Sequence, residues 1–592
     1  MNKKSMLTAL AVLILIAGVF GFYKISQFTE KNIDDDNNES VESISYEVSS
    51  ANSDTVDESD TIIPTQDIDA FEVAPGGFQE VKEITIPEAI VISDGDIGSF
   101  YGNEEFEDVI PVDIRSFSAD NIPAKYDSRN VNGKKYVTDV ENQGYTSLCW
   151  AYAALGAVES DILMHHHDVS ALNLDLSEKH LAYYNAHRAE GSINGYIDDD
   201  YREFVNAEDE KGAWIFDYDT NYVAAGGVAN YCISLLTAWK GPVAETGDDA
   251  FKSLFGSQYI FEDNYDIPSA AYTSEYHVQA VNQICAGILS NTMIKQMVME
   301  HGGVTVGINS DNKFWKGHDL SLYSHFGDKD VPTANHEVLI IGWDDEYSRD
   351  NFASRPEADG AWICKNSWGY ESGESGIMYL SYYDQTIAKN NAAAYSSAVI
   401  GDKDFYDNNY QAAGFLTYMN STTEDSENYV TAYTEASNPY GMLYKTKGDE
   451  AALAIGLMGL ETYQQYEICI FVNPKVSGNI ILCEELQNPD EIMKVSAISG
   501  GFHTFTLPNA IKISKGDEVF ILIKPFTKGK LVFEEAIDQT SKANYDEWKN
   551  LTGNIHNHYS ASGCSFYLSA DGTKLERQKD KDFFVKMYTN DR

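Results

Sequence analysis

The sequence predicts an α+β domain followed by a domain made only of β-strands. Apolar residues recur at helical spacing after Cys149, whereas short strand-like runs dominate beyond His301. Helices first and strands later is the order of an α+β domain, which we place at residues 120–393. After about residue 391 the helical pattern nearly vanishes, and strand-like runs alternate with Gly, Asn, Asp and Pro turns. Residues 394–592 are therefore expected to form a β-sandwich.

Three helices are expected in the first domain. The first begins near Cys149, and the second covers residues 176–184, where Ser177 has a side chain suited to an N-cap. The third covers residues 228–239 and follows a pair of glycines. Four strands are expected after the helices, at residues 304–308, 338–341, 361–364 and 377–382.

The N-terminal residues have the pattern of an export signal. Lys3 and Lys4 precede an uncharged apolar run at residues 6–22, as in a secretory signal peptide. The run is also just long enough to span a bilayer, and no clear A-x-A cleavage site follows it. Residues 1–28 are therefore expected to be either a cleaved signal or an uncleaved membrane anchor, with a buried core helix as the less favoured alternative. Either of the first two places the protein outside the cytoplasm, secreted or at the cell surface.

Residues 29–119 separate this signal from the first domain. The stretch 29–67 is rich in Asp, Glu, Ser and Asn and has few aromatic residues, which is typical of a disordered spacer. Short alternating apolar runs return after residue 70. The composition and the position of this region indicate an acidic spacer followed by a pro-segment.

The charge balance narrows the choice of partner. The chain has 42 basic and 92 acidic residues, and its formal net charge is −50. A surface this acidic repels phosphate backbones and anionic lipid, so nucleic acid is not expected as a partner. Seven cysteines are few for a disulfide-stapled fold, and the odd number leaves at least one thiol free.

No metal site is predicted in the first domain. No two cysteines form a C-x-x-C pair. His165 to His167 are consecutive, and consecutive side chains on a helix point in different directions, so an exposed helix end is the favoured interpretation. The acidic run at 197–201 lacks the spacing of an EF-hand and is more often a solvated loop.

Four polar side chains form a pattern suited to nucleophilic catalysis. Cys149 lies in the first turn of a predicted helix, whose N-terminus stabilises a thiolate, so we expect a lowered thiol pKa. Gln143 can donate a side-chain N–H to a developing oxyanion, together with the backbone N–H of Cys149. His336 heads an apolar strand and can act as the general base. The side-chain oxygen of Asn366 can orient that imidazole, and Trp368 can shield the contact from water.

A lone buried cysteine is usually inert, so the interpretation depends on the whole pattern. These motifs resemble the papain family of cysteine peptidases. The matching segments are 122–129, Gln143-Gly144, Cys149-Trp150, Leu176-Ser177-Glu178, Gly226-Gly227, Asn335-His336 and 366–369. The resemblance implies a two-lobed peptidase, with a helical left lobe and a β-rich right lobe. It also implies that Cys149, His336, Asn366 and Gln143 carry the catalytic roles described above.

The resemblance is closer to a bacterial branch in which a lectin-like domain follows the peptidase. Some members of that branch are clostridial surface proteases that process cell-wall or surface-layer proteins. Thr146 and Ala224 stand where plant and animal members have a pair of cysteines, so that disulfide is absent. The interval between Cys149 and His336 is longer than usual, which insertions in loops would absorb.

The resemblance also implies the residues that bind substrate. Gly226, Gly227, Glu337 and Trp368 match positions of the substrate cleft. Glu337 stands where a small residue is usual, in the pocket for the second residue before the scissile bond. We expect this carboxylate to favour a basic side chain there. The alternative, from strand alternation, is a carboxylate that points away from the cleft.

The sequence thus predicts an exported cysteine endopeptidase that hydrolyses surface or extracellular proteins through an acyl-enzyme intermediate. Protein or peptide substrates are expected, and catalysis requires no cofactor. Calcium is considered only for the β-sandwich domain, and the lectin-like domain is expected to bind cell-wall glycan only by resemblance. Two alternatives are a non-catalytic adhesion protein with a degenerate peptidase and a Cys/His transferase or peptidoglycan amidase. The intact catalytic set disfavours the first, and the Asn-Ser-Trp-Gly segment at 366–369 disfavours the second.

Overall fold

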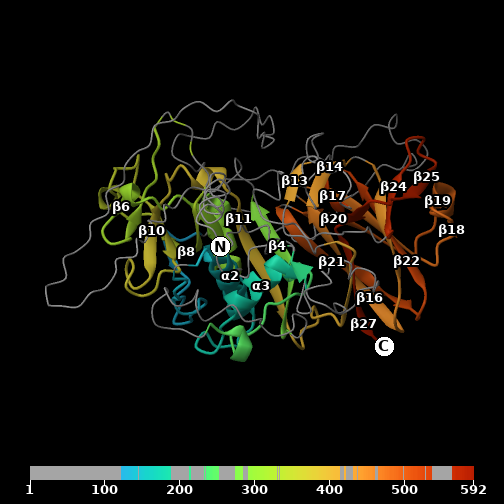
Figure 1. Ribbon diagram of the computed structural model, residues 1–592, viewed down its shortest axis with the longest axis horizontal. Coiled ribbons are helices and arrows are strands. Elements are labelled where there is room, and N and C mark those ends of the chain that lie inside the picture. Colours follow the sequence, from blue (N-terminus) through green and yellow to red (C-terminus); the bar gives the residue numbers. More distant parts are fainter. Residues whose placement is uncertain are drawn as a thin grey trace, which may run out of the picture.

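The computed structural model in Figure 1 describes both predicted domains. The described residues are 122–144, 146–188, 213–214, 233, 235–251, 274–284, 291–327, 329, 331, 334–413, 419–421, 431–436, 438–459, 464–497, 499–526, 529–535 and 563–592. The predicted signal, the spacer and pro-segment, the acidic run 197–201 and Gly226-Gly227 lie outside these residues.

The helical lobe is built on α2 (Cys149–His165), which is buried along most of its length. This helix packs against the strands β8 (His336–Asp344) and β11 (Ala392–Val399). The approach is close at Gly156, where an added Cβ would lie 3.0 Å from Leu339 Cδ2. A larger residue at position 156 would therefore push the catalytic helix away from the strand that begins with His336.

The predicted second helix is confirmed as α3 (Glu178–Ala186). The hydroxyl of Ser177 accepts a hydrogen bond from the backbone N–H of His180 at 2.9 Å, which is the geometry of an N-cap. Within the predicted third helix, residues 235–237 are helical. A further helix, α6 (Asn291–His301), was not predicted and precedes the first strand of the β-rich lobe.

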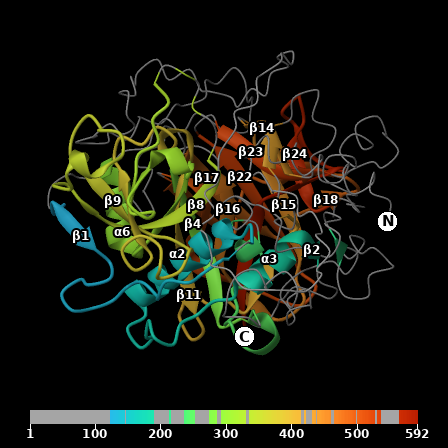
Figure 2. The ribbon, with the colours of Figure 1, turned by 60° about the vertical axis from the view of Figure 1, so that its left-hand side comes forward.

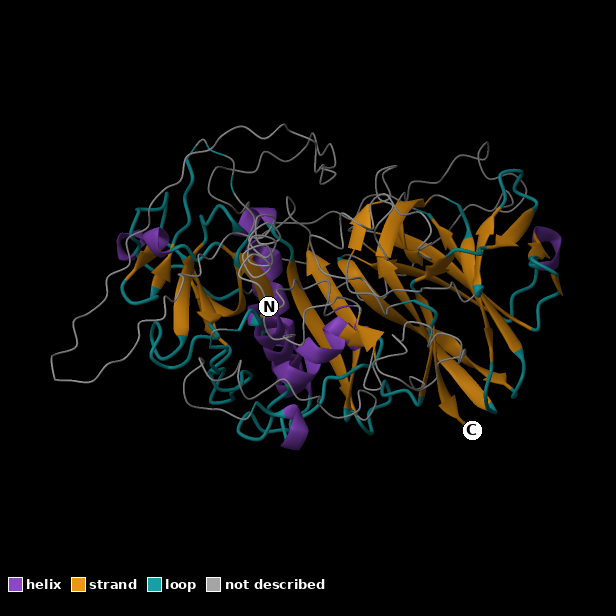
Figure 3. Cartoon of the chain, in the orientation of Figure 1, coloured by secondary structure: helices purple, strands orange, loops and turns teal. Residues whose placement is uncertain are grey.

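The β-rich lobe contains the strands predicted after residue 301. They are β5 (Val304–Ile308), β8, β9 (Ala361–Lys365) and β10 (Ile377–Ser381). Two short strands of the same lobe, β6 (Trp315–Lys316) and β7 (Ser321–Leu322), were not predicted. The edge strand β1 (Lys125–Asp127) pairs with β8. Figure 3 shows the α-helices on the side of the molecule formed by the first domain, with strands filling the rest.

One sheet continues from the first domain into the second. Its strand order is β12-β27-β16-β21-β4-β11-β5-β8-β9-β10-β7-β6. The junction lies between β4 (Tyr276–Ile284) and β21 (Gly500–Ile513), which pair antiparallel (Figure 1). Figure 2 shows β4 close to α2 and β11 of the first domain. At Gly501 the two strands are so close that an added Cβ would lie 1.9 Å from the carbonyl oxygen of Val281. The predicted boundary at 393/394 falls inside β11, which pairs with β4 and β5.

The second domain is a β-sandwich, as predicted. One layer is the end of the shared sheet, formed by β12 (Asn408–Tyr410), β16 (Glu450–Gly459), β21 and β27 (Val585–Asp591). The other layer has the order β18-β19-β25-β24-β15-β22-β17-β20. Ile455 and Met587 from the first layer share a buried core with Ile468 and Ile521 from the second.

The remaining elements complete the second layer and the loops. The second layer comprises β15 (Tyr440–Lys445), β17 (Gln464–Val472), β18 (Val476–Ser477), β19 (Ile480–Leu482), β20 (Glu491–Ala497), β22 (Glu518–Pro525), β24 (Ser565–Leu568) and β25 (Lys574–Arg577). A smaller sheet contains β13 (Met419–Ser421), β14 (Thr431–Ala436), β23 (Gly529–Glu535) and β26 (Lys581–Phe583), and β2 (His187–Arg188) pairs with β3 (Ala213–Trp214). The 3-10 turns are η4 (Gly247–Asp249), η6 (Asn312–Phe314), η7 (Arg349–Asn351), η8 (Ile387–Lys389) and η9 (Cys483–Glu485).

Aromatic rings and a buried lysine join the two domains beside the junction. The ring of Trp239 stacks on His277 at 3.7 Å and on Tyr588 at 5.6 Å, and His277 also stacks on Phe405. The buried Lys586 ammonium donates to the carbonyl oxygen of Thr237 at 2.6 Å. Trp239, Tyr588 and Lys586 are buried, and β4 pairs with β21 beside them, so the domains are expected to move as one unit.

In the part of the chain that the structure describes, no helix is both long and apolar enough to cross a membrane. The apolar run at residues 6–22, on which the prediction of a signal or anchor depends, lies outside that part.

Candidate active site

Cys149 is the first residue of α2, as the sequence predicts. Leu148 precedes it and provides no side-chain cap, so the backbone N–H groups of the first turn have no side-chain acceptor there. The thiol is part-buried, whereas Cys364, Cys469 and Cys483 are buried. Hydrogen bonds from the backbone amides of Cys149, Trp150 and Glu337 lower the pKa of the thiol. The sulfur therefore lies between the start of α2 and the start of β8.

His336 and Asn366 are brought together by adjacent strands. His336 opens β8, and Asn366 follows the last residue of β9. The imidazole Nε2 lies 2.8 Å from Asn366 Oδ1, which also accepts the backbone N–H of Ser367 at 2.8 Å. Trp368 stacks on the imidazole with the ring centroids 4.6 Å apart. The hydrogen bond to an amide oxygen fixes the proton on Nε2 and leaves Nδ1 as the basic nitrogen.

Gln143 is held in place by the segment that carries Asn366. Its Oε1 accepts the hydroxyl of Ser367 at 2.6 Å, and its backbone N–H donates to the carbonyl of Ser367 at 2.8 Å. Its Nε2 donates to the carbonyl oxygen of Thr146 at 2.9 Å. An amide nitrogen carries two hydrogens, so one remains for an oxyanion. The sequence analysis did not single out Ser367, because a serine inside Asn-Ser-Trp-Gly gives no sign of its partner.

Trp315 is a second residue that the sequence analysis missed. Its ring centroid lies 5.8 Å from that of Trp368, and its indole N–H donates to the carbonyl of Ser310 at 3.0 Å. Trp315 thereby supports the ring that covers His336. The sequence carries no local signal for this contact, because the two tryptophans are far apart in the chain.

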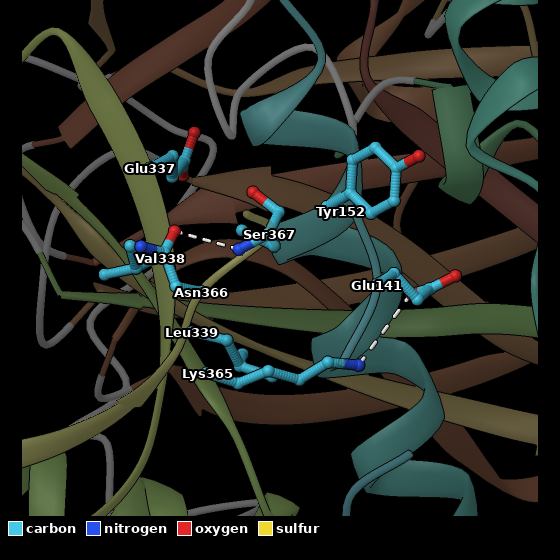
Figure 4. Close-up of a pocket in the computed structure, with 9 residues that line it drawn as sticks. Glu141, Tyr152, Glu337, Val338, Leu339, Lys365, Asn366 and Ser367 are labelled. Carbon is cyan, nitrogen blue, oxygen red and sulfur yellow. Dashed lines mark hydrogen bonds and ion pairs between the residues drawn. The ribbon is translucent and has the colours of Figure 1, made fainter. Parts of the chain in front are cut away.

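Glu337 is the residue after His336 in β8 and lies beside the thiol. Its side chain is buried, and burial raises its pKa to about 8. Figure 4 shows its carboxylate pointing away from the pair formed by Lys365 and Glu141. Burial is the largest cause that raises the pKa of Cys149, and the charge of Glu337 is the second largest. This residue therefore affects the nucleophile directly.

The electrostatics differ from the expectation of a lowered thiol pKa. Burial and Glu337 raise the pKa of Cys149 to about 12, which outweighs the backbone amides at the helix start. Burial also lowers the pKa of His336 to about 4, against a hydrogen bond to Asn366 that raises it. Both groups are therefore neutral at pH 7 in this structure, because removing charged groups from water costs more than the helix terminus returns.

A small cavity lies behind these residues, between α2 and the strands β8 and β9. Its lining comprises Glu141, Tyr152, Ala153, Glu337, Val338, Leu339, Lys365, Asn366 and Ser367 (Figure 4). The Lys365 ammonium lies 3.8 Å from Glu141 Oε2 and donates to Thr138 Oγ1 at 2.8 Å. The predicted substrate residues Gly226 and Gly227 lie outside the described part of the chain, so their place in the cleft stays a prediction.

The first domain matches a known family. The profile of the papain family cysteine proteases matches residues 122–399. A cysteine protease of Blomia tropicalis is 21% identical over 286 residues, which is 47% of this chain and 66% of that protein. Procathepsin L of Felis catus is 28% identical over 261 residues, covering 44% of this chain and 61% of that protein. The chain thus spans less than two thirds of the length of these relatives.

Two solved structures share the fold of both domains. One is a clostridial cysteine protease, Cwp84, after propeptide cleavage, with a TM-score of 0.54, 20% identity and coverage of 77% of this chain and 97% of that one. The other contains the cysteine protease and lectin-like domains of Cwp84, described as a surface layer associated protein of Clostridium difficile. It has a TM-score of 0.55 and 19% identity, and covers 79% of this chain and 89% of that one.

The family match covers the segment that carries Cys149, its contact with the backbone N–H of Glu337, and the hydrogen bond between His336 and Asn366. The same two-domain architecture recurs in the clostridial structures. Residues 122–399 form a peptidase domain that belongs to the papain family of cysteine proteases.

Proposed function

We propose that this protein is an exported cysteine endopeptidase that cleaves surface or extracellular proteins. The observation that carries the proposal is the hydrogen bond between His336 Nε2 and Asn366 Oδ1. It orients the imidazole so that Nδ1 is the nitrogen available to the thiol. Cys149 in turn lies against the backbone N–H of Glu337, the residue after His336. These contacts suit a thiol–imidazole pair.

In the proposed reaction, His336 Nδ1 takes the proton of Cys149 as the sulfur attacks the scissile carbonyl carbon. The carbonyl oxygen becomes an oxyanion, which accepts hydrogen bonds from the backbone N–H of Cys149 and from Gln143 Nε2. The intermediate collapses when the C–N bond breaks and the imidazolium protonates the departing amine. Water then attacks the thioester, with His336 as base, and releases the carboxylic acid and the free thiol. These steps use only thiol, imidazole, amide and water.

The neutral state of the resting pair makes the first proton transfer part of the reaction. Because burial disfavours both the thiolate and the imidazolium, charge develops when substrate enters and the oxyanion donors are engaged. We expect the pH optimum to depend on the substrate-bound active site more than on the helix terminus alone.

The location and the accessory domain are part of the same proposal. The basic and apolar N-terminus supports export, with residues 6–22 either removed or kept as a membrane tether. The relative with both domains is named as a surface layer associated protein, which supports a cell-surface location. Binding of cell-wall glycan or calcium by the β-sandwich domain and cleavage of a pro-segment within residues 29–119 stay predictions.

An epoxide inhibitor of cysteine proteases tests the proposal directly. The full chain is incubated with the inhibitor and then digested for mass spectrometry. The expected result is one covalent adduct on Cys149 and a parallel loss of casein hydrolysis. Labelling of another cysteine in its place, or casein hydrolysis that survives full labelling, contradicts the proposed nucleophile.

Glu337 is proposed to select a basic residue at the second position before the scissile bond. Its carboxylate is buried beside the thiol, where a charged partner is worth more than in water. Profiling on a peptide library above pH 8, where Glu337 is ionised, should show a preference for Lys or Arg at that position. Glu337→Gln keeps the shape and removes the charge, so the preference should fall at least about tenfold. Equal profiles for the two proteins would mean that the carboxylate does not meet the substrate.

The same substitution has a pH-dependent effect on stability. Burial raises the pKa of Glu337 from 4.5 to about 8. Between those values the folded protein holds a proton that the unfolded chain has lost, so the free energy of unfolding falls as pH rises through this window. Glu337→Gln should therefore be more stable than the wild type at pH 8, by on the order of 4 kcal/mol, and equally stable near pH 4. Urea unfolding at both pH values measures the difference, and a constant difference would contradict the buried carboxyl.

A further inference from the structure

Lys365 is a buried lysine that reaches from one lobe of the peptidase domain to the other. It is the last residue of β9 in the β-rich lobe, and its side chain is 7% exposed. Its ammonium donates to Thr138 Oγ1 at 2.8 Å and lies 3.8 Å from Glu141 Oε2. Both partners belong to the segment that leads to α2. Figure 4 shows the Lys365 side chain extended toward Glu141.

The contact continues from Thr138 into the helix that carries the nucleophile. The Thr138 hydroxyl donates to Glu159 Oε2 at 2.5 Å, and Glu159 Oε1 accepts the backbone N–H of Leu176 at 2.9 Å. Glu159 is 1% exposed and lies in the middle of α2, which begins at Cys149. A series of hydrogen bonds thus runs from the end of β9 through Thr138 to α2.

The residues next to Lys365 indicate what this connection positions. Asn366 follows it directly, and Lys365 itself pairs with β8, the strand that begins with His336. On the other side of Asn366, the Ser367 hydroxyl donates to Gln143 Oε1 at 2.6 Å. Asn366 is therefore flanked by two side chains that reach out of the β-rich lobe toward the segment before the nucleophile.

Stability alone does not account for a charged side chain at this position. Removing an ammonium and a carboxylate from water costs free energy, and apolar side chains of similar size often stabilise a core as much or more. Hydrogen bonds to charged groups are directional, however, so they can fix the register of two packed elements. Lys365 and Glu159 are charged groups of this kind, joined through Thr138 where the lobes meet.

We propose that Lys365 is a positioning residue, which holds Asn366 and His336 of the β-rich lobe in register with Cys149 of the helical lobe. This inference rests on the proposed peptidase function and adds the contact that aligns the two halves of its active site. Alignment matters because the thiol and the imidazole come from different lobes. A displacement of about 1 Å between reacting groups can lower a rate about 100-fold.

The test replaces Lys365 by Met in the full chain, which keeps an unbranched side chain of similar length and removes the charge. The measured quantities are kcat and KM for one peptide substrate and the rate of iodoacetamide modification at Cys149 at pH 7. Lys365→Met should lower kcat at least about tenfold and change KM by less than about threefold. It should also slow the modification of Cys149 at least about threefold, because the imidazole is no longer aligned with the thiol.

Lys295→Met is the matched control. Lys295 is also buried, and its ammonium donates to Asp345 Oδ1 at 2.6 Å, but this ion pair lies within the β-rich lobe. Both substitutions should lower the Tm, whereas Lys295→Met should leave kcat within about twofold of the wild type.

A double variant separates positioning from stability. Glu159→Gln neutralises the carboxylate that Lys365→Met leaves without its cation, so the combination should regain Tm. Its kcat should stay low, because the contact between the lobes is still missing.

The inference is overturned if Lys365→Met keeps kcat within about twofold of the wild type, or if Lys295→Met loses as much kcat. It is equally overturned if the double variant regains kcat together with Tm, because Lys365 then acts through stability. The modification rate requires no peptidase activity. An inactive wild type would therefore contradict the proposed function, whereas equal modification rates in the wild type and Lys365→Met would contradict the role of Lys365.

Discussion

Cys149→Ala is expected to lower kcat for casein hydrolysis at least about 10⁴-fold. The substitution removes the only atom of the proposed site that can form the acyl intermediate, while His336, Asn366 and Gln143 stay in place. Because Cys149 is part-buried and its methylene remains as a methyl group, the free energy of unfolding should change by less than about 1 kcal/mol. Loss of activity with an unchanged fold is the signature of a nucleophile.

Cys564→Ser is the matched control for this result. Cys564 is also a part-buried cysteine, but it lies in the β-sandwich domain. Its replacement should leave kcat within about twofold of the wild type. If both variants lose activity, the loss would come from a change in protein stability or redox state and not from removal of the nucleophile. Residual activity of Cys149→Ala above about 1% of the wild type would exclude Cys149 as the nucleophile.

Gly501→Ala is expected to lower the free energy of unfolding by about 3 kcal/mol or more. Gly501 has a φ of +108°, and an added Cβ would lie 1.9 Å from the carbonyl oxygen of Val281. The new methyl group would separate β21 from β4 at the point where the shared sheet crosses between the domains. Phe502, which follows and is fully buried, would lose its packing. Urea unfolding should also lose its single transition as the domains uncouple.

Gly516→Ala separates the two causes of this effect. Gly516 has a φ of +91° but has open space around an added Cβ. An alanine at this position introduces the backbone strain without the steric overlap. It should lower the free energy of unfolding by about 1 kcal/mol. If the two variants lose a similar amount of unfolding free energy, close packing at the strand junction does not explain the effect of Gly501→Ala.

The proposed catalytic residues could be chosen from the sequence because each of them has a local sequence signal. A cysteine at a helix start, a histidine at a strand start and an asparagine two residues before a tryptophan each have a chemical reason to be there. The N-cap at Ser177 is a local effect of the same kind, and the structure confirms it. Order along the chain likewise predicted helices before strands and a β-sandwich after them.

The features that were missed depend on contacts between distant segments. The pairing of β4 with β21 joins residues more than 200 positions apart, and no local pattern marks it. The contacts of Ser367 with Gln143 and of Trp315 with Trp368 have the same origin. The expectation of a low thiol pKa was wrong. The helix terminus, which lowers the pKa, can be predicted from the sequence, but burial and the neighbouring Glu337 charge, which raise it, appear only in three dimensions.

The dependence of Cys149 on His336 tests the central claim most directly. Iodoacetamide is added to the full chain at pH 7, and the rate of modification at Cys149 is followed by mass spectrometry in the wild type and in His336→Ala. If His336 takes the thiol proton, the wild type should react at least about tenfold faster than the variant. Equal rates at Cys149 in the two proteins would contradict the thiol–imidazole pair.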